Sequence, residues 1–152
     1  MDKISLKPSA MLAPLPAVMV SCGSTEDGSA NIITIAWTGI INSDPPCTYV
    51  SVRPSRASHS IIEKSGEFVI NLVPESMAAA MDWCGCVSKN KEEKFGEKVL
   101  STGGGLSFTL TPEPAEKVSC VAVRECPVQL ECRVFDVRRL GSHDMFMAEI
   151  VN

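Results

Sequence analysis

The sequence predicts one mainly β domain, an antiparallel barrel or sandwich that carries two short helices. Three observations lead to this fold class. Seven or eight short runs rich in apolar and β-branched residues are separated by turn signals, and only two stretches have helical composition. The third observation is the length, because 152 residues without an internal repeat or a linker fit a single domain that can bury its own core.

The strand predictions rest on alternating polarity and on β-branched content. The predicted strands occupy residues 17–22, 31–38, 47–53, 67–73, 106–111, 117–123, 127–134 and 143–151. The segment at 127–134 alternates most regularly, which predicts one inward and one outward face. The inward face is formed by Val128, Leu130, Cys132 and Val134. The outward face is formed by Gln129, Glu131 and Arg133.

Two segments predict helices. Residues 57–65 precede Gly66, a residue typical of the position just past a helix end. Within this segment, Ser60 and Glu63 have the spacing of an N-terminal capping box. Residues 76–84 combine high helix propensity with an apolar stripe, and we expect the glycine that follows directly to end this helix.

Composition excludes several function classes. The formal net charge is −4, so the chain lacks the broad positive field that nonspecific nucleic-acid binding requires. The sequence contains no run of about 18 uncharged apolar residues, the minimum for a membrane span. Prolines 8, 14 and 16 interrupt the N-terminal stretch, which does not resemble a signal peptide. We therefore expect no nucleic-acid partner, no membrane association and a cytoplasmic location.

Cysteine usage supports the same location. Seven cysteines cannot all pair within one chain. Most of them lie in apolar, strand-like runs, which favours reduced thiols over a secreted disulfide framework. We expect all seven to be buried structural thiols.

The junction at residues 51–63, SVRPSRASHSIIE, carries the strongest candidate site. A strand ends, a proline turns the chain and a helix begins, so backbone N–H groups and the positive end of the helix dipole lie near Arg53 and Arg56. With the hydroxyls of Ser51 and Ser58, these groups form a suitable site for a phosphate. The alternative is a solvated loop whose serines only cap the helix.

The segment CGCVSKNKEEKF at 84–95 allows two interpretations. Its two cysteines are separated by one residue and no second pair has metal-ligand spacing, so we expect no metal site. Its charged part is typical of a solvated helix face. Alternatively, Ser88, Lys89 or Lys94 reaches the phosphate bound at residues 51–59.

Two further features are weaker. The strand at 31–38 and Gly39 after it present backbone groups suited to a planar ligand, but a core position for Trp37 explains the same pattern. His143 precedes Asp144 at the start of a strand. Neighbours in a strand point to opposite faces, so adjacency alone does not make this pair a catalytic unit, and a surface histidine is the simpler interpretation.

Four segments, in this order, resemble the flavin reductase-like family and, within it, the flavoredoxins. They are NIITIAWTGIINSDPPCTYVSVRPSRASHSIIEKSGEFVINL, DWCGCVSKNKEEKF, ECPVQLECRV and GSHDMF. The resemblance begins near Pro16 and covers the rest of the chain. It implies an FMN-binding split β-barrel that works as a homodimer with the flavin near the subunit interface.

The resemblance also implies roles for individual residues. Those lining the isoalloxazine would be Thr34, Ala36, Trp37 and Thr38. Those holding the ribityl phosphate would be Ser51, Val52, Arg53, Arg56 and Ser58, with Ser88 and Lys94 as helpers. His143 would lie near the flavin. Lys89 stands where the family usually has glycine. Family domains also usually continue past the GSHDMF strand, and we therefore expect the single domain of residues 1–152 to lack its last strands.

The resemblance implies an oxidoreductase that passes reducing equivalents from NADH or NADPH through bound FMN. The cofactor carries the chemistry, so no acid or base side chain is required and no catalytic residue is assigned. A second hypothesis is an FMN electron carrier that docks a redox protein, in which case the acidic net charge would steer a basic partner. A third is a flavin-free barrel that binds another phosphorylated ligand.

Overall fold

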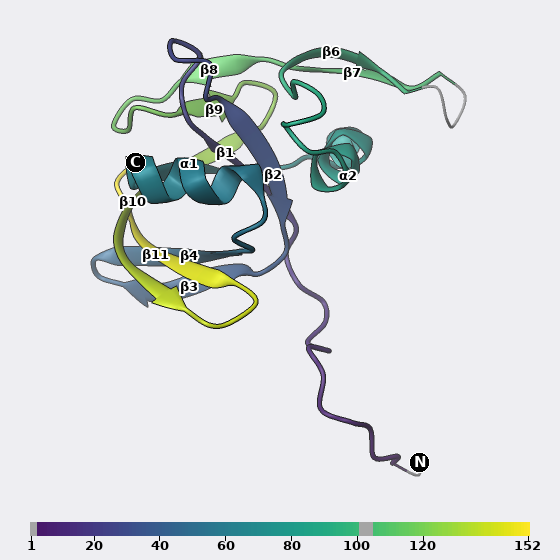
Figure 1. Ribbon diagram of the computed structural model, residues 1–152, viewed down its shortest axis with the longest axis vertical. Coiled ribbons are helices and arrows are strands. Elements are labelled where there is room, and N and C mark those ends of the chain that lie inside the picture. The colour runs from purple at the N-terminus through teal and green to yellow at the C-terminus, as the bar shows by residue number, and fades with distance from the viewer. Residues whose placement is uncertain (1–2, 101–104) are drawn as a thin grey trace.

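The centre of the fold is an antiparallel sheet that curls into a half-barrel (Figure 1). The structure is a computed structural model that describes residues 3–100 and 105–152. Within these residues the sheet has the strand order β2-β1-β5-β10-β11-β4-β3. Its strands are β1 (Val18–Cys22), β2 (Asn31–Ile35), β3 (Thr38–Ser43), β4 (Pro46–Val52), β5 (Glu67–Leu72), β10 (Val128–Arg139) and β11 (Asp144–Ile150). The predicted mainly β, split-barrel class with short helices is confirmed.

Smaller elements surround this sheet (Figure 1). Two hairpin-like pairs are β6 (Gly96–Val99) with β7 (Ser107–Leu110), and β8 (Pro112–Pro114) with β9 (Val121–Val123). The helical elements are α1 (Ala57–Ser65), the short 3₁₀ helix η1 (Glu75–Met77) and α2 (Ala78–Cys86). Helix α1 follows β4 directly, which places the helix start beside the end of that strand.

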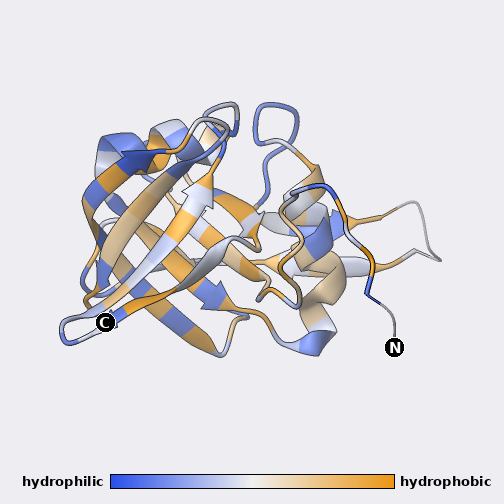
Figure 2. Ribbon diagram, turned by 90° about the horizontal axis from the view of Figure 1, so that it is seen from below, coloured by the Kyte–Doolittle hydropathy of each residue, from blue (hydrophilic) through white to orange (hydrophobic). Residues whose placement is uncertain are grey.

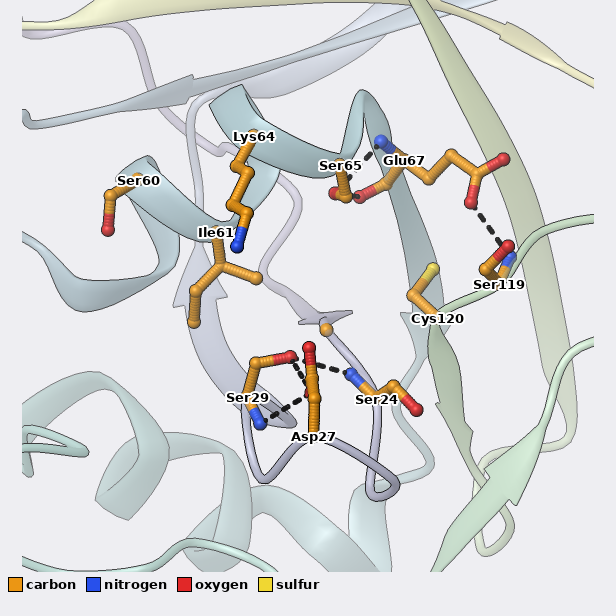
Figure 3. A pocket seen from close by; sticks show the side chains of 11 residues that line it. Ser24, Asp27, Ser29, Ser60, Ile61, Lys64, Ser65, Glu67, Ser119 and Cys120 are labelled. Carbon is orange, nitrogen blue, oxygen red and sulfur yellow. Dashed lines mark hydrogen bonds between the residues drawn. The ribbon is translucent and has the colours of Figure 1, made fainter.

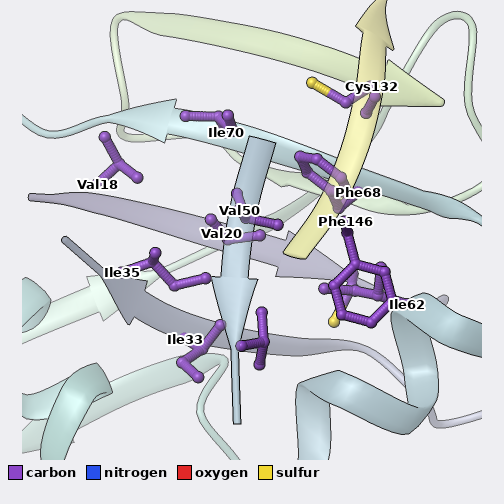
Figure 4. Packing of buried hydrophobic residues seen from close by; sticks show 13 residues of the cluster. Val18, Val20, Ile33, Ile35, Val50, Ile62, Phe68, Ile70, Cys132 and Phe146 are labelled. Atoms are coloured by element: carbon purple, nitrogen blue, oxygen red, sulfur yellow. The ribbon is translucent and has the colours of Figure 1, made fainter. Parts of the chain in front are cut away.

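Hydrophobic and hydrophilic residues alternate along the strands (Figure 2), and buried clusters lie on both sides of the sheet. The larger cluster includes Phe68, Phe146, Val20 and Val50, with Ile62 contributed by α1 (Figure 4). Burying one such side chain stabilises a fold by about 1.5–3 kcal/mol. The second cluster packs α2 against the opposite side of β1 and β2, and its members include Met19, Ile32, Ala80, Cys84 and Leu110.

The predicted strand at 31–38 is two strands, which corrects the sequence analysis. β2 ends at Ile35 and β3 begins at Thr38, so the chain bends at Ala36 and Trp37. The physical reason is that the two halves pair with different neighbours, β2 with β1 and β3 with β4. The bend is held by the Ser51 backbone N–H, which donates to the Trp37 carbonyl at 2.9 Å.

Helix α1 has the predicted bounds but not the predicted N-terminal cap. Gly66 follows it with φ of 69° and donates its N–H to the Ile62 carbonyl at 2.8 Å, as the glycine signal predicts. The capping box is wrong, because Arg56 occupies the N-cap position and makes no side-chain cap hydrogen bond. The Ser60 hydroxyl donates instead to the Ala57 carbonyl at 3.2 Å. The start of α1 is therefore left without a capping side chain.

The second helix runs through the glycine that was expected to end it. Gly85 lies within α2, where a Cβ would approach the Thr34 side chain to 3.2 Å. This glycine therefore permits close packing of α2 on β2. The predicted strand at 117–123 is also shorter than expected, because only the last three residues, β9, pair with β8.

The predicted faces of the 127–134 segment are partly wrong. Cys132 is fully buried as expected, but Val128 is exposed and Glu131 is buried. The Glu131 carboxylate accepts hydrogen bonds from the backbone N–H groups of Glu116, Lys117 and Val118, at 2.8, 2.6 and 3.2 Å. Burial of this charge is thus compensated by a neighbouring loop, which polarity alternation does not reveal.

Candidate functional site

An open cavity of about 190 Å³ lies where β2, β4 and the start of α1 meet. Eight of the residues that the family resemblance assigned to a flavin line it together: Thr34, Ala36, Trp37, Ser51, Val52, Arg53, Arg56 and His143. Ile33 and Ile35 complete the wall. The bend between β2 and β3 supplies one side, and the end of β4 with the following loop supplies the other. One side of the cavity is therefore apolar and the other is cationic.

A smaller cavity of about 20 Å³ adjoins the first at Ile33 and Arg56, which line both. It contains the remaining residues expected near the phosphate, Ser58, Ser88 and Lys94. The structure thus brings eleven of the twelve expected site residues to two neighbouring cavities. Thr38 lines neither cavity, because its hydroxyl donates to the Tyr49 carbonyl at 2.6 Å and ties β3 to β4.

The start of α1 provides the main electrostatic feature of the site. No side chain caps this end, and its first turn contains no acidic residue. Uncapped N–H groups and the helix dipole attract anions. Arg53 and Arg56 precede the helix and both line the larger cavity, adding two guanidinium groups to this positive end.

Two lysines adjoin the same region, although neither lies on the expected solvated helix face. Lys94 is buried and donates to the carbonyls of Ile32 and Cys84 at 2.6 and 2.7 Å. Burial lowers the pKa of its ammonium group below the ordinary value, and the Arg56 charge acts in the same direction. Lys89 donates to the Gly28 carbonyl at 2.9 Å and so links the 23–30 turn to the smaller cavity.

Trp37 and His143 form one wall of the larger cavity. Their ring centroids lie 4.3 Å apart with a 40° angle between the planes. Burial lowers the pKa of His143, and the Arg53 guanidinium lowers it further, which favours the neutral imidazole. The adjacent Asp144 does not serve this histidine, since its carboxylate points to the buried His59, 2.7 Å away. His143 is therefore a half-buried part of the cavity wall and not a solvated surface histidine.

Asn31 is a site residue that the sequence analysis missed. It is 2% exposed, lines the smaller cavity and donates through Nδ2 to the Ser58 hydroxyl at 2.8 Å. Its Oδ1 is the single buried side-chain N or O atom without a hydrogen-bond partner in the described part of the chain. Strand alternation puts Asn31 on the same face as Ile33, so a polar residue on an otherwise apolar face was the available signal.

A third cavity, of about 430 Å³, exceeds both in volume and lies beside the second half of α1. Figure 3 shows Ile61 and Lys64 of that helix opposite Asp27 and Ser29 of the 23–30 turn. The Asp27 carboxylate already accepts hydrogen bonds from the backbone N–H and hydroxyl of Ser29. None of the twelve expected site residues lines this cavity, so size alone does not identify the candidate site.

The cysteines are all free, and six of the seven are buried. Cys86, at the end of α2, is exposed, which corrects the expectation that all seven are buried. Burial raises the pKa of Cys22 and Cys132 to about 12 and that of Cys84 and Cys126 to about 11. These four thiols are therefore protonated and unreactive near neutral pH.

Residues 3–100 and 105–152 contain neither a candidate metal site nor a membrane-spanning helix. In that part of the chain, no three side chains of His, Cys, Asp or Glu are grouped as ligands for a metal ion. Among the helices of the same residues, none has the length and apolar character needed to cross a bilayer.

The geometry fits a ligand with a planar ring at one end and a phosphate at the other. An apolar wall with an exposed tryptophan suits the ring, and an uncapped helix start with two arginines suits the phosphate. The fold is a split barrel of the class found in flavin-binding families. Residues 11–152 match the model of the flavin reductase like domain, and the chain belongs to this family.

Solved structures agree with the family. Flavoredoxin of Desulfovibrio vulgaris (Miyazaki F) is 29% identical with a TM-score of 0.82, over 99% of this chain and 75% of that one. Flavoredoxin from Methanosarcina acetivorans is 24% identical with a TM-score of 0.81, over 100% and 74%. An FMN-binding protein from Thermus thermophilus, with bound p-hydroxybenzaldehyde, is 18% identical with a TM-score of 0.77, over 100% and 78%. The predicted family and its flavoredoxin-like character are confirmed.

Proposed function

We propose that the protein binds FMN at the two adjoining cavities and acts as an oxidoreductase that accepts a hydride from NADH or NADPH. The observation that carries the proposal is the juxtaposition of an apolar, tryptophan-bearing wall with an uncapped, arginine-flanked helix start. Family membership supports a flavin, and the FMN-binding protein of Thermus thermophilus supports FMN in particular.

The residues fit this cofactor at the phosphate end. Arg53, Arg56 and the first N–H groups of α1 would hold the phosphate by charged hydrogen bonds. Asn31 carries an unpartnered Oδ1 at the same place. Rotating its amide by 180° lets Oδ1 accept from the Ser58 hydroxyl and turns Nδ2 into the cavity as a donor. Lys94 would contribute positive charge from the wall of the smaller cavity, where its two carbonyl partners hold it.

At the ring end, Thr34, Ala36 and Trp37 would orient the isoalloxazine and keep water from one of its faces. The neutral His143 beside Trp37 would contribute one hydrogen-bonding nitrogen near the ring. Bound FMN would supply the two-electron redox chemistry, with hydride arriving from the nicotinamide. No side chain of the chain is assigned a proton-transfer role in this step.

The second candidate is an FMN electron carrier that docks a redox protein. The similarity to the Desulfovibrio vulgaris flavoredoxin, at 29% identity, favours it. In this function the same two cavities hold FMN, and the partner protein takes the place of the nicotinamide. The two candidates therefore share a cofactor and differ in the reductant.

The first experiment is the visible absorption spectrum of the purified protein, followed by identification of the cofactor released by heat. We expect a flavin spectrum and released FMN. NADH and NADPH are then added separately under anaerobic conditions. Rapid bleaching supports the reductase, and a spectrum that persists supports the carrier. A colourless protein that does not take up added FMN contradicts both and favours another phosphorylated ligand.

A further inference from the structure

A buried pair of side chains connects the two ends of the candidate site. His59 lies in the first turns of α1 and Asp144 is the first residue of β11, 85 residues later. Their Nε2 and Oδ2 atoms are 2.7 Å apart, and both side chains are about 5% exposed or less. A carboxylate only accepts hydrogen bonds, so Nε2 of His59 carries the proton that it donates.

An exposed arginine at the end of β10 adds to the same connection. Arg139, the last residue of β10, donates from Nη1 to the Asp144 carboxylate and from Nη2 to Glu63 of α1 at 2.6 Å. The hydrogen bond from His59, together with that from Arg139, lowers the pKa of Asp144 despite its burial. The carboxylate is therefore ionised at neutral pH and bonded on both sides.

The neighbours of this pair are site residues. Ser58, directly before His59, lines the smaller cavity, where the proposed site would hold the phosphate. Arg56 lies one turn earlier, at the N-cap of the helix. His143, directly before Asp144, packs against Trp37 at a tilted angle, at the ring end of the site. Across the sheet, Asp144 is the ladder partner of Val52, which lines the ring-end cavity.

We propose that Asp144 is a positioning residue that joins the two ends of the flavin site. Through its bond to His59 it holds the start of α1 against the sheet, and the same bond anchors the first residue of β11, directly after His143. The inference rests on the proposed binding of FMN. A change at Asp144 should therefore affect recognition of the phosphate and the environment of His143 together, without touching the cofactor directly.

The test compares FMN with riboflavin, which has the same ring and lacks the phosphate. Dissociation constants for both are measured by equilibrium dialysis on the wild-type protein and on Asp144→Ala and Asp144→Asn. In Asp144→Ala we expect FMN affinity to fall about tenfold, the usual consequence of losing one charged hydrogen bond. Riboflavin affinity should fall less, so the preference for FMN narrows. Asp144→Asn keeps one acceptor oxygen, so its FMN affinity should lie between those of the wild type and Asp144→Ala.

Two readouts separate positioning from general stability. The His143 ring resonances, followed by NMR across a pH titration, should change in both Asp144 variants. Glu131→Gln is the matched control, because it alters another buried, hydrogen-bonded carboxylate that lines neither cavity. It should lower the unfolding temperature and leave the FMN-to-riboflavin preference unchanged. Should Asp144→Ala not fold, Arg139→Gln changes an exposed arm of the same connection and should narrow the preference in the same direction.

Each outcome is decisive. Wild-type flavin preference and wild-type His143 resonances in a folded Asp144→Ala protein overturn the inference. Equal losses for FMN and riboflavin overturn the link to the phosphate end. A wild-type protein that binds neither flavin overturns the proposed function itself, which distinguishes that failure from a failure of this inference.

Discussion

The proposed phosphate site depends on single residues at the start of α1. Arg53 and Arg56 contribute charge, and the missing helix cap leaves backbone donors open. A capping serine or aspartate would satisfy these donors internally and, if acidic, repel an anion. The unusual arginine at the N-cap position therefore makes functional sense where a structural cap would be the ordinary choice.

We expect Arg53→Ala and Arg56→Ala each to weaken FMN binding by about 1–3 kcal/mol, because each removes a charged hydrogen bond to the phosphate. Riboflavin binding should change little. Titration of each flavin into flavin-free protein, followed by fluorescence, measures both effects. Arg138→Ala is a suitable control, since this exposed arginine on β10 pairs with Asp136 at 2.7 Å and lines neither cavity. Unchanged FMN affinity in both variants would contradict the assignment of the phosphate site.

At the level of elements, one buried carboxylate on β10 organises a loop that has no regular structure of its own. Glu131 accepts from three consecutive backbone N–H groups of the 116–118 segment and from the Asn152 side chain at 3.0 Å. Burial by itself would raise the pKa of Glu131, but the four hydrogen bonds outweigh it and lower the pKa below the ordinary value of 4.5. The folded state therefore prefers the ionised form.

The sign of the pH dependence follows from this lowered pKa. A carboxyl group that is more acidic in the folded state contributes its full stability above its unfolded-state value and loses it as the pH falls through the folded-state value. We expect the unfolding free energy of the wild type to decrease below about pH 4.5. Glu131→Gln should cost about 1–3 kcal/mol at pH 7 and reduce this dependence.

Urea unfolding of the wild type and of Glu131→Gln at pH 7 and pH 4 measures both effects. Glu116→Gln is the control, because its side chain is exposed in the same loop. An identical pH dependence in wild type and Glu131→Gln would show that another group is responsible.

For the whole molecule, the edge of the sheet at β3 is an exposed apolar feature. β3 forms one end of the strand order and has no partner on its outer side within the described residues. Ile40 and Ile41 on this strand are 73% and 45% exposed. An open, apolar edge strand is prone to pairing with another chain unless it is covered.

We propose that a second copy of the chain covers this edge, consistent with the homodimer that the family resemblance implies. Light scattering of the wild type should then give the mass of a dimer, and Ile40→Lys should shift the protein toward the monomer. Val99→Lys is the control, because Val99 is 69% exposed on the separate β6–β7 pair. A monomeric wild type, or a dimer unaffected by Ile40→Lys, would contradict this assignment.

Most of the secondary structure and the grouping of residues around the cavity of about 190 Å³ were predictable, because their signals are local. Polarity alternation located most of the strands, and Gly66 marked the end of α1. One continuous motif of the family resemblance includes Trp37, Arg53 and Arg56, so a local sequence pattern predicts them as neighbours in a site, and the structure places all three around one cavity. The wrong predictions concern residues whose environment depends on distant parts of the chain, such as Glu131 and the glycine inside α2.

A mainly β fold and membership of the flavin reductase-like family follow from local patterns, because alternation and short motifs depend only on neighbouring residues. Three features depend on the folded arrangement of the chain: the bend between β2 and β3, the unpartnered Oδ1 of Asn31 and the pairing of His59 with Asp144. The partners in the two side-chain pairs, Asn31 with Ser58 and His59 with Asp144, lie 27 and 85 residues apart. Hydrogen bonds between such distant residues form only when the sheet brings their strands and helices together, and no local pattern in the chain encodes them.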